Sequence, residues 1–257
     1  MKEQFAAADH YDQAPQAYPE IAGDRLSSLD CRTFQRFLSE YRAGNSIVDL
    51  GCGTGRVSRH LARALAPNLV VAIDISEREL HLARELAAGS AITNIAYVRG
   101  DALNPPLREI LFCSCHGVLH HTPAPDHALQ QLARALAKGG ILYLAIYSQS
   151  WYTKLHKVFG VLRRARCAGN EWLVEVAYRF YYVPRFLLRV LETGCLRDDF
   201  NIRGSFEDFV MTPYAFGFTE KDLAKLFEMC GLQVIDYEIL NYGLLHSYVL
   251  RKDAASG

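Results

Sequence analysis

Between residues 46 and 148, short apolar runs alternate with segments that carry apolar residues at helical spacing. The apolar runs predict strands at residues 46–50, 69–75, 94–98, 110–115 and 141–147. The amphipathic segments predict helices at residues 57–65, 77–88 and 126–137, the last of them ended by Gly139 and Gly140. Nearly continuous apolar strands that alternate with helices are typical of a parallel sheet covered on both faces. The sequence therefore predicts a doubly wound α/β fold.

The C-terminal part of the chain returns to this pattern. Thr219 and Asp222 closely match a capping box at the start of a helix predicted over residues 219–230. Two further strands are expected at residues 232–240 and 244–251. Because the connection between them is short, they are expected to pair antiparallel at a sheet edge. The full prediction is a seven-stranded, mostly parallel sheet with an antiparallel C-terminal strand pair.

A segment of different character, residues 149–218, follows the fifth strand. It contains three stripes of apolar residues at helical spacing, with an interruption expected at Pro184 and an end at Gly194. Residues 197–219 are aromatic but show no periodicity. We interpret the segment as a helical insertion that packs over the carboxyl end of the sheet.

The expected organisation has a core and two covering parts. The core comprises residues 46–148 and 219–252, and the insertion at residues 149–218 forms a substrate lid. Residues 1–45 form an N-terminal helical cover, with a helix over about residues 25–41.

The strongest local signal is the run VDLGCGTGR at residues 48–56, between the first strand and the first helix. A glycine-rich turn at this place lets a ligand approach the backbone closely. Dinucleotide cofactors favour G-x-G-x-x-G, but here the third glycine comes one residue early and Arg56 takes its place. The spacing therefore disfavours a nicotinamide-dependent oxidoreductase.

Acidic residues stand at three neighbouring strand ends. Asp74 closes the second strand and could accept both hydroxyls of a ribose, while Asp101 closes the third strand and could accept an adenine amino group. Asp49, just before the glycines, could help hold an ammonium group. Three carboxylates suit a cationic nucleoside without phosphate and would repel a pyrophosphate.

These runs resemble the motifs of class I S-adenosylmethionine-dependent methyltransferases. VDLGCGTG, AIDIS and GDA resemble that family's first three motifs, and HGVLHHTPAPDHALQQLARALAKGGILYLAIY resembles the region around its fourth and fifth strands. The resemblance covers residues 45–147 and the final helix and strand pair. It implies a Rossmann-like fold, with S-adenosyl-L-methionine as cofactor and S-adenosyl-L-homocysteine as product. Leu111 departs from the family, in which an acidic residue often opens the fourth strand.

The resemblance also implies a set of cofactor contacts. The glycines border the methionine end of the cofactor, Asp74 takes the ribose, Asp101 and Ala102 meet the adenine, and the backbone of His116 lies near the methionine moiety. N-terminal tyrosines fold over the cofactor, where a ring face stabilises a sulfonium by about 0.5–2 kcal/mol. Simple helix packing explains them equally well. The expected cofactor-binding residues are Tyr11, Tyr18, Asp49, Gly51, Gly53, Gly55, Asp74, Ile75, Asp101, Ala102 and His116.

Candidate catalytic residues follow the fourth strand. His120 and His121 would lie at the mouth of the site, where a neutral histidine accepts a proton from a hydroxyl or ammonium nucleophile. The alternative is that they only orient the adjoining turn. Aromatic residues of the insertion, among them Tyr152, Tyr214 and Phe216, are candidates for substrate contacts.

Charge and cysteine content limit the partners. The chain has 28 Lys plus Arg against 28 Asp plus Glu, which argues against a dedicated nucleic-acid binder. The segment from residue 154 to residue 197 is nevertheless basic, so RNA or a membrane surface is a possible partner, although a solvated face is the simpler interpretation. Seven irregularly spaced cysteines indicate a reducing, cytoplasmic setting. Cys113 and Cys115 are expected to be core thiols, and no metal site is expected.

The sequence thus favours an enzyme that methylates an oxygen, nitrogen or carbon atom of a small molecule. A methyltransferase of RNA or of a lipid-linked substrate is the first alternative. A non-catalytic sensor or subunit that binds the same cofactor is the second.

Overall fold

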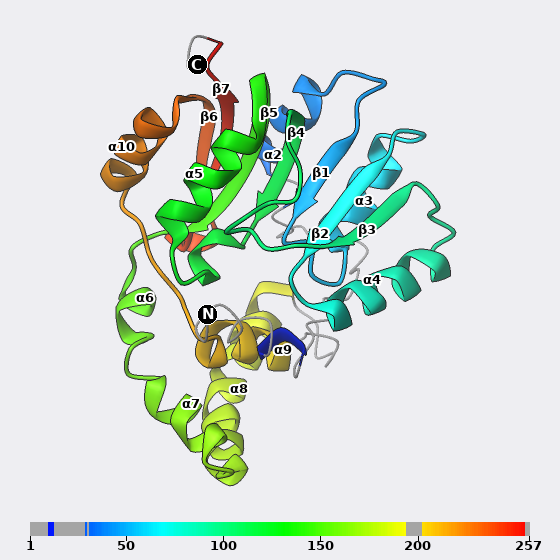
Figure 1. Ribbon diagram of the computed structural model, residues 1–257. Helices are drawn as coiled ribbons and strands as arrows, with labels where there is room; N and C mark the ends of the chain where they lie inside the picture. The colour runs from blue at the N-terminus through cyan, green and yellow to red at the C-terminus, as the bar shows by residue number, and fades with distance from the viewer. Residues whose placement is uncertain (1–9, 13–28, 30, 194–201, 255–257) are drawn as a thin grey trace.

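The computed structural model describes residues 10–12, 29, 31–193 and 202–254, and within them seven strands form one sheet (Figure 1). The strand order is β3-β2-β1-β4-β5-β7-β6. Neighbours from β3 to β5 are parallel, whereas β7 is antiparallel to both β5 and β6. The strands are β1 (Ile47–Leu50), β2 (Val70–Asp74), β3 (Ile95–Arg99), β4 (Ile110–His116), β5 (Leu136–Tyr147), β6 (Leu232–Leu240) and β7 (Leu245–Lys252). This confirms the predicted fold class and the C-terminal strand pair.

Helices cover both faces of the sheet. On one face, α5 (Pro125–Ala135) and α10 (Glu220–Cys230) bury apolar residues against the central strands. On the other, α2 (Arg32–Glu40) and α3 (Arg56–Ala64) pack on a second cluster, and α4 (Glu77–Gly89) packs beside them. Local signals set the helix ends as predicted. Ser76 caps α4, and Thr219 and Asp222 form the capping box of α10.

The start of β5 differs from the sequence prediction. Helix α5 ends at Ala135 and the strand begins at Leu136, so Gly139 and Gly140 lie inside the strand and do not end the helix. The pairing with β4 shifts between Leu136 and Ile141. Gly139 has φ 73°, which a side chain disfavours, and this backbone lets extra residues bulge out before pairing resumes.

The described part of the insertion is mostly helical, with irregular backbone over residues 212–218. It contains α6 (Trp151–Leu155), α7 (Gly160–Cys167), α8 (Glu171–Thr193), α9 (Ile202–Phe206) and a π-helical turn, η2 (Glu207–Met211). Figure 1 shows these elements gathered beyond one end of the sheet. None of the helices in the described ranges combines the length and the apolar character needed to cross a bilayer.

One prediction for the insertion is wrong. Helix α8 continues through Pro184, because packing along the helix, including the stacked rings of Tyr182 and Phe186 at 5.6 Å, offsets the loss of one backbone donor. The aromatic segment without periodicity contributes α9 and η2, which bury Phe206 and Val210 in the insertion's own cluster. Gly194, the expected end of the third stripe, lies outside the described residues.

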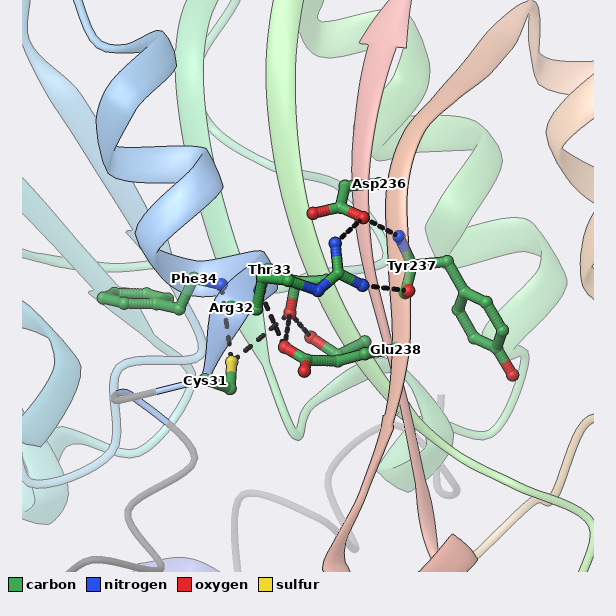
Figure 2. Close-up of polar contacts among 8 residues, drawn as sticks. Cys31, Arg32, Thr33, Phe34, Asp236, Tyr237 and Glu238 are labelled. Atoms are coloured by element: carbon green, nitrogen blue, oxygen red, sulfur yellow. Dashed lines mark hydrogen bonds and ion pairs between the residues drawn. The ribbon is translucent and has the colours of Figure 1, made fainter.

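The N-terminal helix begins at Arg32, later than the predicted residue 25, because Cys31 caps it and Leu29 lies in a turn. Figure 2 shows how its first turn is attached to β6. The N–H and the hydroxyl of Thr33 donate to Glu238 Oε1 at 2.7 and 2.8 Å, and Arg32 pairs with Asp236 and donates to the Tyr237 carbonyl at 2.7 Å. These contacts join the N-terminal helix to the C-terminal strand pair.

Candidate active site

The glycine turn connects β1 to α3. Gly51, Gly53 and Gly55 have φ values of 72°, 51° and 76°, a conformation that other residues adopt at a cost. A Cβ on Gly51 would lie 2.2 Å from Val118 Cγ2, so this glycine makes room for the segment after β4. At Gly53 the nearest atom would be Glu79 Oε2 at 3.8 Å. Gly53 is therefore the position of the turn that leaves space for a ligand.

Asp74 stands at the end of β2, beside this turn. Its Oδ2 accepts the N–H of Gly53 at 2.8 Å, and its Oδ1 accepts the N–H of Ser76 at 2.9 Å. Burial raises the pKa of Asp74, and the two backbone donors oppose that rise. Because a carboxylate has about four acceptor positions, capacity remains for hydroxyl donors. The ribose contact of Asp74 stays a prediction.

Asp49 is enclosed in the sheet beneath the turn. Its side chain is 1% exposed and accepts the Ser58 hydroxyl at 2.5 Å. Burial raises the pKa of Asp49 to about 7, and the charge of Asp74 raises it further, while the Ser58 hydrogen bond lowers it. Asp49 is thus poised to lose its proton when a cation arrives.

The adenine-side candidates lie at the neighbouring strand end. The Gly100 N–H donates to the Asp74 carbonyl at 2.9 Å, which brings the turn after β3 beside Asp74. Asp101 Oδ1 accepts the Leu103 N–H at 2.8 Å, and Ala102 is buried. Ile75 follows Asp74, and its carbonyl accepts Arg99 Nε at 3.2 Å. The adenine contact itself stays a prediction.

His116 ends β4 with its ring stacked on Tyr143 at 5.9 Å. Burial and the nearby Arg56 cation lower the pKa of His116 to about 4, so the ring is neutral at ordinary pH. Within β4, the Cys113 and Cys115 thiols are fully buried, which agrees with their predicted place in the core.

His120 and His121 form a short 3-10 turn, η1 (Leu119–His121), and both are buried. His120 Nδ1 accepts the N–H of Tyr147 at 3.2 Å, so the neutral ring carries its proton on Nε2. Burial, followed by the two neighbouring histidines, holds the pKa of His120 well below its usual value. Nε2 is buried and has no hydrogen-bond partner among the described residues. His120 is therefore arranged as a neutral donor.

The ring of His121 is oriented by the insertion. Its Nδ1 lies 2.7 Å from the Tyr214 carbonyl, an acceptor, so Nδ1 carries the proton and Nε2 carries the lone pair. The Phe216 N–H donates to the His120 carbonyl at 3.0 Å, and the Tyr214 and Phe216 rings stack at 6.3 Å. The two histidines thus meet two of the predicted substrate-contact residues. The third, Tyr152, lies in α6, and its side chain is outside the described part.

The described N-terminal residues lie near the end of β2. Asp12 accepts the hydroxyl of Ser76, and its carbonyl accepts Arg78 Nη1 at 2.9 Å. These contacts place Asp12 beside Ser76, whose N–H donates to Asp74, and the cofactor contact of Tyr11, the preceding residue, stays a prediction. Tyr18 lies outside the described residues, so its predicted role is untested.

The sequence prediction missed three charged residues and one tyrosine. Arg59 is 2% exposed, and its Nη1 donates to the Thr54 carbonyl at 2.6 Å, which supports the glycine turn from below. Glu79 is equally buried beside Gly53, and Asp12 anchors the N-terminal segment. Tyr147 stacks on His120. Arg59 and Glu79 left a signal, because each is a charge on the buried face of a predicted helix.

An open glycine turn, carboxylates at adjacent strand ends and a cap over β4 and β5 define a doubly wound α/β enzyme that binds a nucleoside cofactor. The buried acidic pair suits a cation, and the donors around Asp74 leave acceptor capacity for ribose hydroxyls. The residues present therefore fit S-adenosylmethionine. No group of three or more metal-ligating side chains occurs in the described ranges.

Comparison with known proteins identifies a methyltransferase domain in this chain. Residues 47–140 match the family model of a methyltransferase domain. The ubiquinone/menaquinone biosynthesis C-methyltransferase UbiE of Edwardsiella ictaluri is 27% identical over 203 residues, which is 74% of each chain. The chain spans less of other curated relatives, 25% of one and 57% of another.

Solved structures share the fold at low identity. Magnesium protoporphyrin IX methyltransferase from Synechocystis PCC 6803, with bound SAH, superposes with a TM-score of 0.60 and 15% identity, over 98% of both chains. The [4+2]-cyclase SpnF gives 0.58 and 14%, over 96% of this chain and 95% of that one. Residues 47–140 therefore form a methyltransferase domain, and the motifs together with the UbiE relatives indicate that its methyl donor is S-adenosylmethionine.

Proposed function

We propose that the protein transfers a methyl group from S-adenosylmethionine to an oxygen, nitrogen or carbon nucleophile of a small molecule by in-line displacement. The observation that carries the proposal is the opposite hydrogen bonding of two adjacent histidines after β4: His120 Nδ1 accepts the Tyr147 N–H, whereas His121 Nδ1 faces the Tyr214 carbonyl oxygen. A merely structural turn does not require one donor and one acceptor nitrogen in adjacent rings.

The cofactor, when bound, supplies an electrophilic methyl group on a sulfonium, so the chain's own task is alignment and proton management. Asp74 would hold the ribose, and ionised Asp49 would favour the ammonium end. The ring face of Tyr11 would stabilise the sulfonium. The insertion excludes water from the nucleophile.

The two histidines divide the work on the substrate. His121 Nε2 carries the lone pair and accepts the proton of a hydroxyl or ammonium nucleophile. His120 Nε2–H donates to an acceptor oxygen of the substrate and thereby orients it. The sequence left open which of the two histidines is the general base, and the hydrogen bonds favour His121. The expected substrate has a nucleophile with a removable proton and a nearby oxygen acceptor.

A lipid-linked substrate is the second candidate, and one observation favours it. Helix α8 exposes large apolar side chains, among them Trp172 and Phe180, at the far end of the insertion. We also propose a cytoplasmic setting, because the seven cysteines are odd in number and irregularly spaced.

The test follows label from methyl-labelled S-adenosylmethionine into a fractionated extract of the source organism. Label in a small, water-soluble product supports the proposal. Label confined to lipid favours the second candidate, and label confined to RNA contradicts both. Cofactor binding without transfer to any fraction would favour a non-catalytic sensor or subunit.

A further inference from the structure

Helix α8 has two apolar faces on opposite sides. The inner face carries Val174, Tyr178 and Tyr181, which pack with Phe206 and Val210 in the insertion's own cluster. The described side chains on the opposite side of α8 take no part in that cluster.

The outer face is also apolar, yet it is exposed. Trp172, Val176, Phe180, Val183 and Leu187 are 65%, 43%, 78%, 56% and 55% exposed. With about 3.6 residues per turn, these five positions fall within an arc of about 80° along one side of the helix. Single exposed apolar residues are ordinary, but a continuous row over four turns marks an interaction surface.

Basic residues occur in the same arm of the insertion, in and between α6 and α7. The segment from residue 154 to residue 197 contains nine Lys or Arg against three Glu. Lys154, Lys157 and Arg164 are exposed and form no ion pair among the described residues. Glu175, in contrast, is already paired, with Arg203 at 2.9 Å and Arg179 at 3.6 Å. The arm formed by α6, α7 and α8 therefore presents apolar side chains together with uncompensated positive charge.

We propose that this outer face of α8 docks on the surface of a bilayer that contains anionic phospholipid. Apolar side chains enter the boundary between headgroups and acyl chains, while the lysines and arginines contact the phosphates. A second copy of this chain fits less well, because two equally basic arms would repel each other. RNA fits less well too, since Val176, Val183 and Leu187 offer neither stacking surfaces nor charge.

The surface is connected to the site. The inner face of α8 contacts Phe206, and Phe209 in the following turn stacks on Tyr147 at 5.7 Å, which in turn stacks on His120 at 3.7 Å. Figure 1 shows α7 and the first part of α8 at the end of the molecule farthest from the sheet. A docked α8 thus holds the insertion, and through it the substrate side of the site, next to the lipid.

The test is co-sedimentation of the full chain with vesicles of phosphatidylcholine alone or of equal parts phosphatidylcholine and phosphatidylglycerol. We expect binding to the anionic vesicles that weakens with added salt, and a blue shift of tryptophan emission that Trp172→Phe removes. The double variant Val176→Ser/Phe180→Ser is expected to bind about tenfold or more weakly. Met229→Ser, at an apolar residue of α10 that is 64% exposed, is the matched control and is expected to bind normally.

Thermal unfolding and cofactor affinity should be unchanged in the double variant, because both side chains point away from the cluster. Three outcomes would overturn the proposal. They are no binding of the wild type to anionic vesicles at low salt, equal binding by the double variant, or a dimer in solution that the same substitutions dissociate. None of these measurements depends on methyl transfer, so the result is independent of the proposed function.

Discussion

The imidazole of His120 lies flat against the ring of Tyr147, with centroids 3.7 Å apart, and accepts the backbone N–H of the same tyrosine. This double contact fixes both the plane and the tautomer of the histidine. His121 has a different hydrogen-bond partner, because its Nδ1 faces the Tyr214 carbonyl oxygen. Adjacent histidines in one short turn are thereby given different chemical roles.

This separation predicts different kinetics for the two variants. His121→Ala removes the proposed base and should lower kcat by about 10²–10⁴-fold, with unchanged cofactor affinity. Steady-state kinetics and calorimetry of cofactor binding should show the loss in kcat alone. The matched control is His127→Ala, at an exposed histidine of α5.

His120→Ala should instead raise KM or lower kcat without changing the shape of the pH–rate profile above pH 6, since burial keeps the pKa of His120 well below its usual value. The assignment fails if both variants keep full rate across the neutral range.

Removal of the Asp74 carboxylate should weaken cofactor binding. Asp74→Ala leaves the ribose hydroxyls and the Gly53 N–H without their acceptor, which costs about 1–3 kcal/mol. Isothermal calorimetry with S-adenosylhomocysteine measures the change, and Asp126→Ala, at an exposed residue, is the control. Unchanged affinity in Asp74→Ala would remove this residue from the site.

The raised pKa of Asp49 predicts a pH dependence of cofactor binding. Burial raises that pKa to about 7, so at lower pH the free protein holds the carboxyl protonated. A bound ammonium favours the ionised form, so binding releases a proton, and affinity should rise up to about tenfold per pH unit until about pH 7 and then level off. Asp49→Asn should make the affinity nearly independent of pH. A flat wild-type profile between about pH 5.5 and pH 8 would show that Asp49 does not sense the cofactor charge.

Gly51 is expected to be sensitive because of Val118. A Cβ at this position would lie 2.2 Å from Val118 Cγ2, on a backbone with φ 72°. Gly51→Ala should lower the free energy of unfolding by about 1–3 kcal/mol, measured by urea denaturation. Adding Val118→Ala should restore the part of the lost stability that comes from the overlap with Val118. The part that comes from the positive φ should remain lost. Gly89→Ala, where nothing lies within 4 Å, should cost nothing, and an equal loss there would refute the explanation.

The strands and most helices of the core were predictable from the spacing of apolar residues along the sequence. The capping box of α10 and the Ser76 cap of α4 were readable because a cap joins residues only three positions apart. The break predicted at Pro184 and the helix end predicted at Gly139 failed for the opposite reason. Each was decided by packing or strand pairing with distant residues that local propensity does not report.

By itself, the sequence determined the alternation of strands and helices, the glycine turn and the acidic residues at the strand ends, because periodicity and turn chemistry act over a few neighbours. Only the tertiary structure decided which histidine holds a proton on which nitrogen, that Gly51 makes room for Val118, and that burial raises the pKa of Asp49 to about 7. It also decided that α8 keeps one apolar face exposed. Tautomers, desolvation and exposure depend on contacts between residues that are far apart in the sequence. Such contacts exist only in the folded structure.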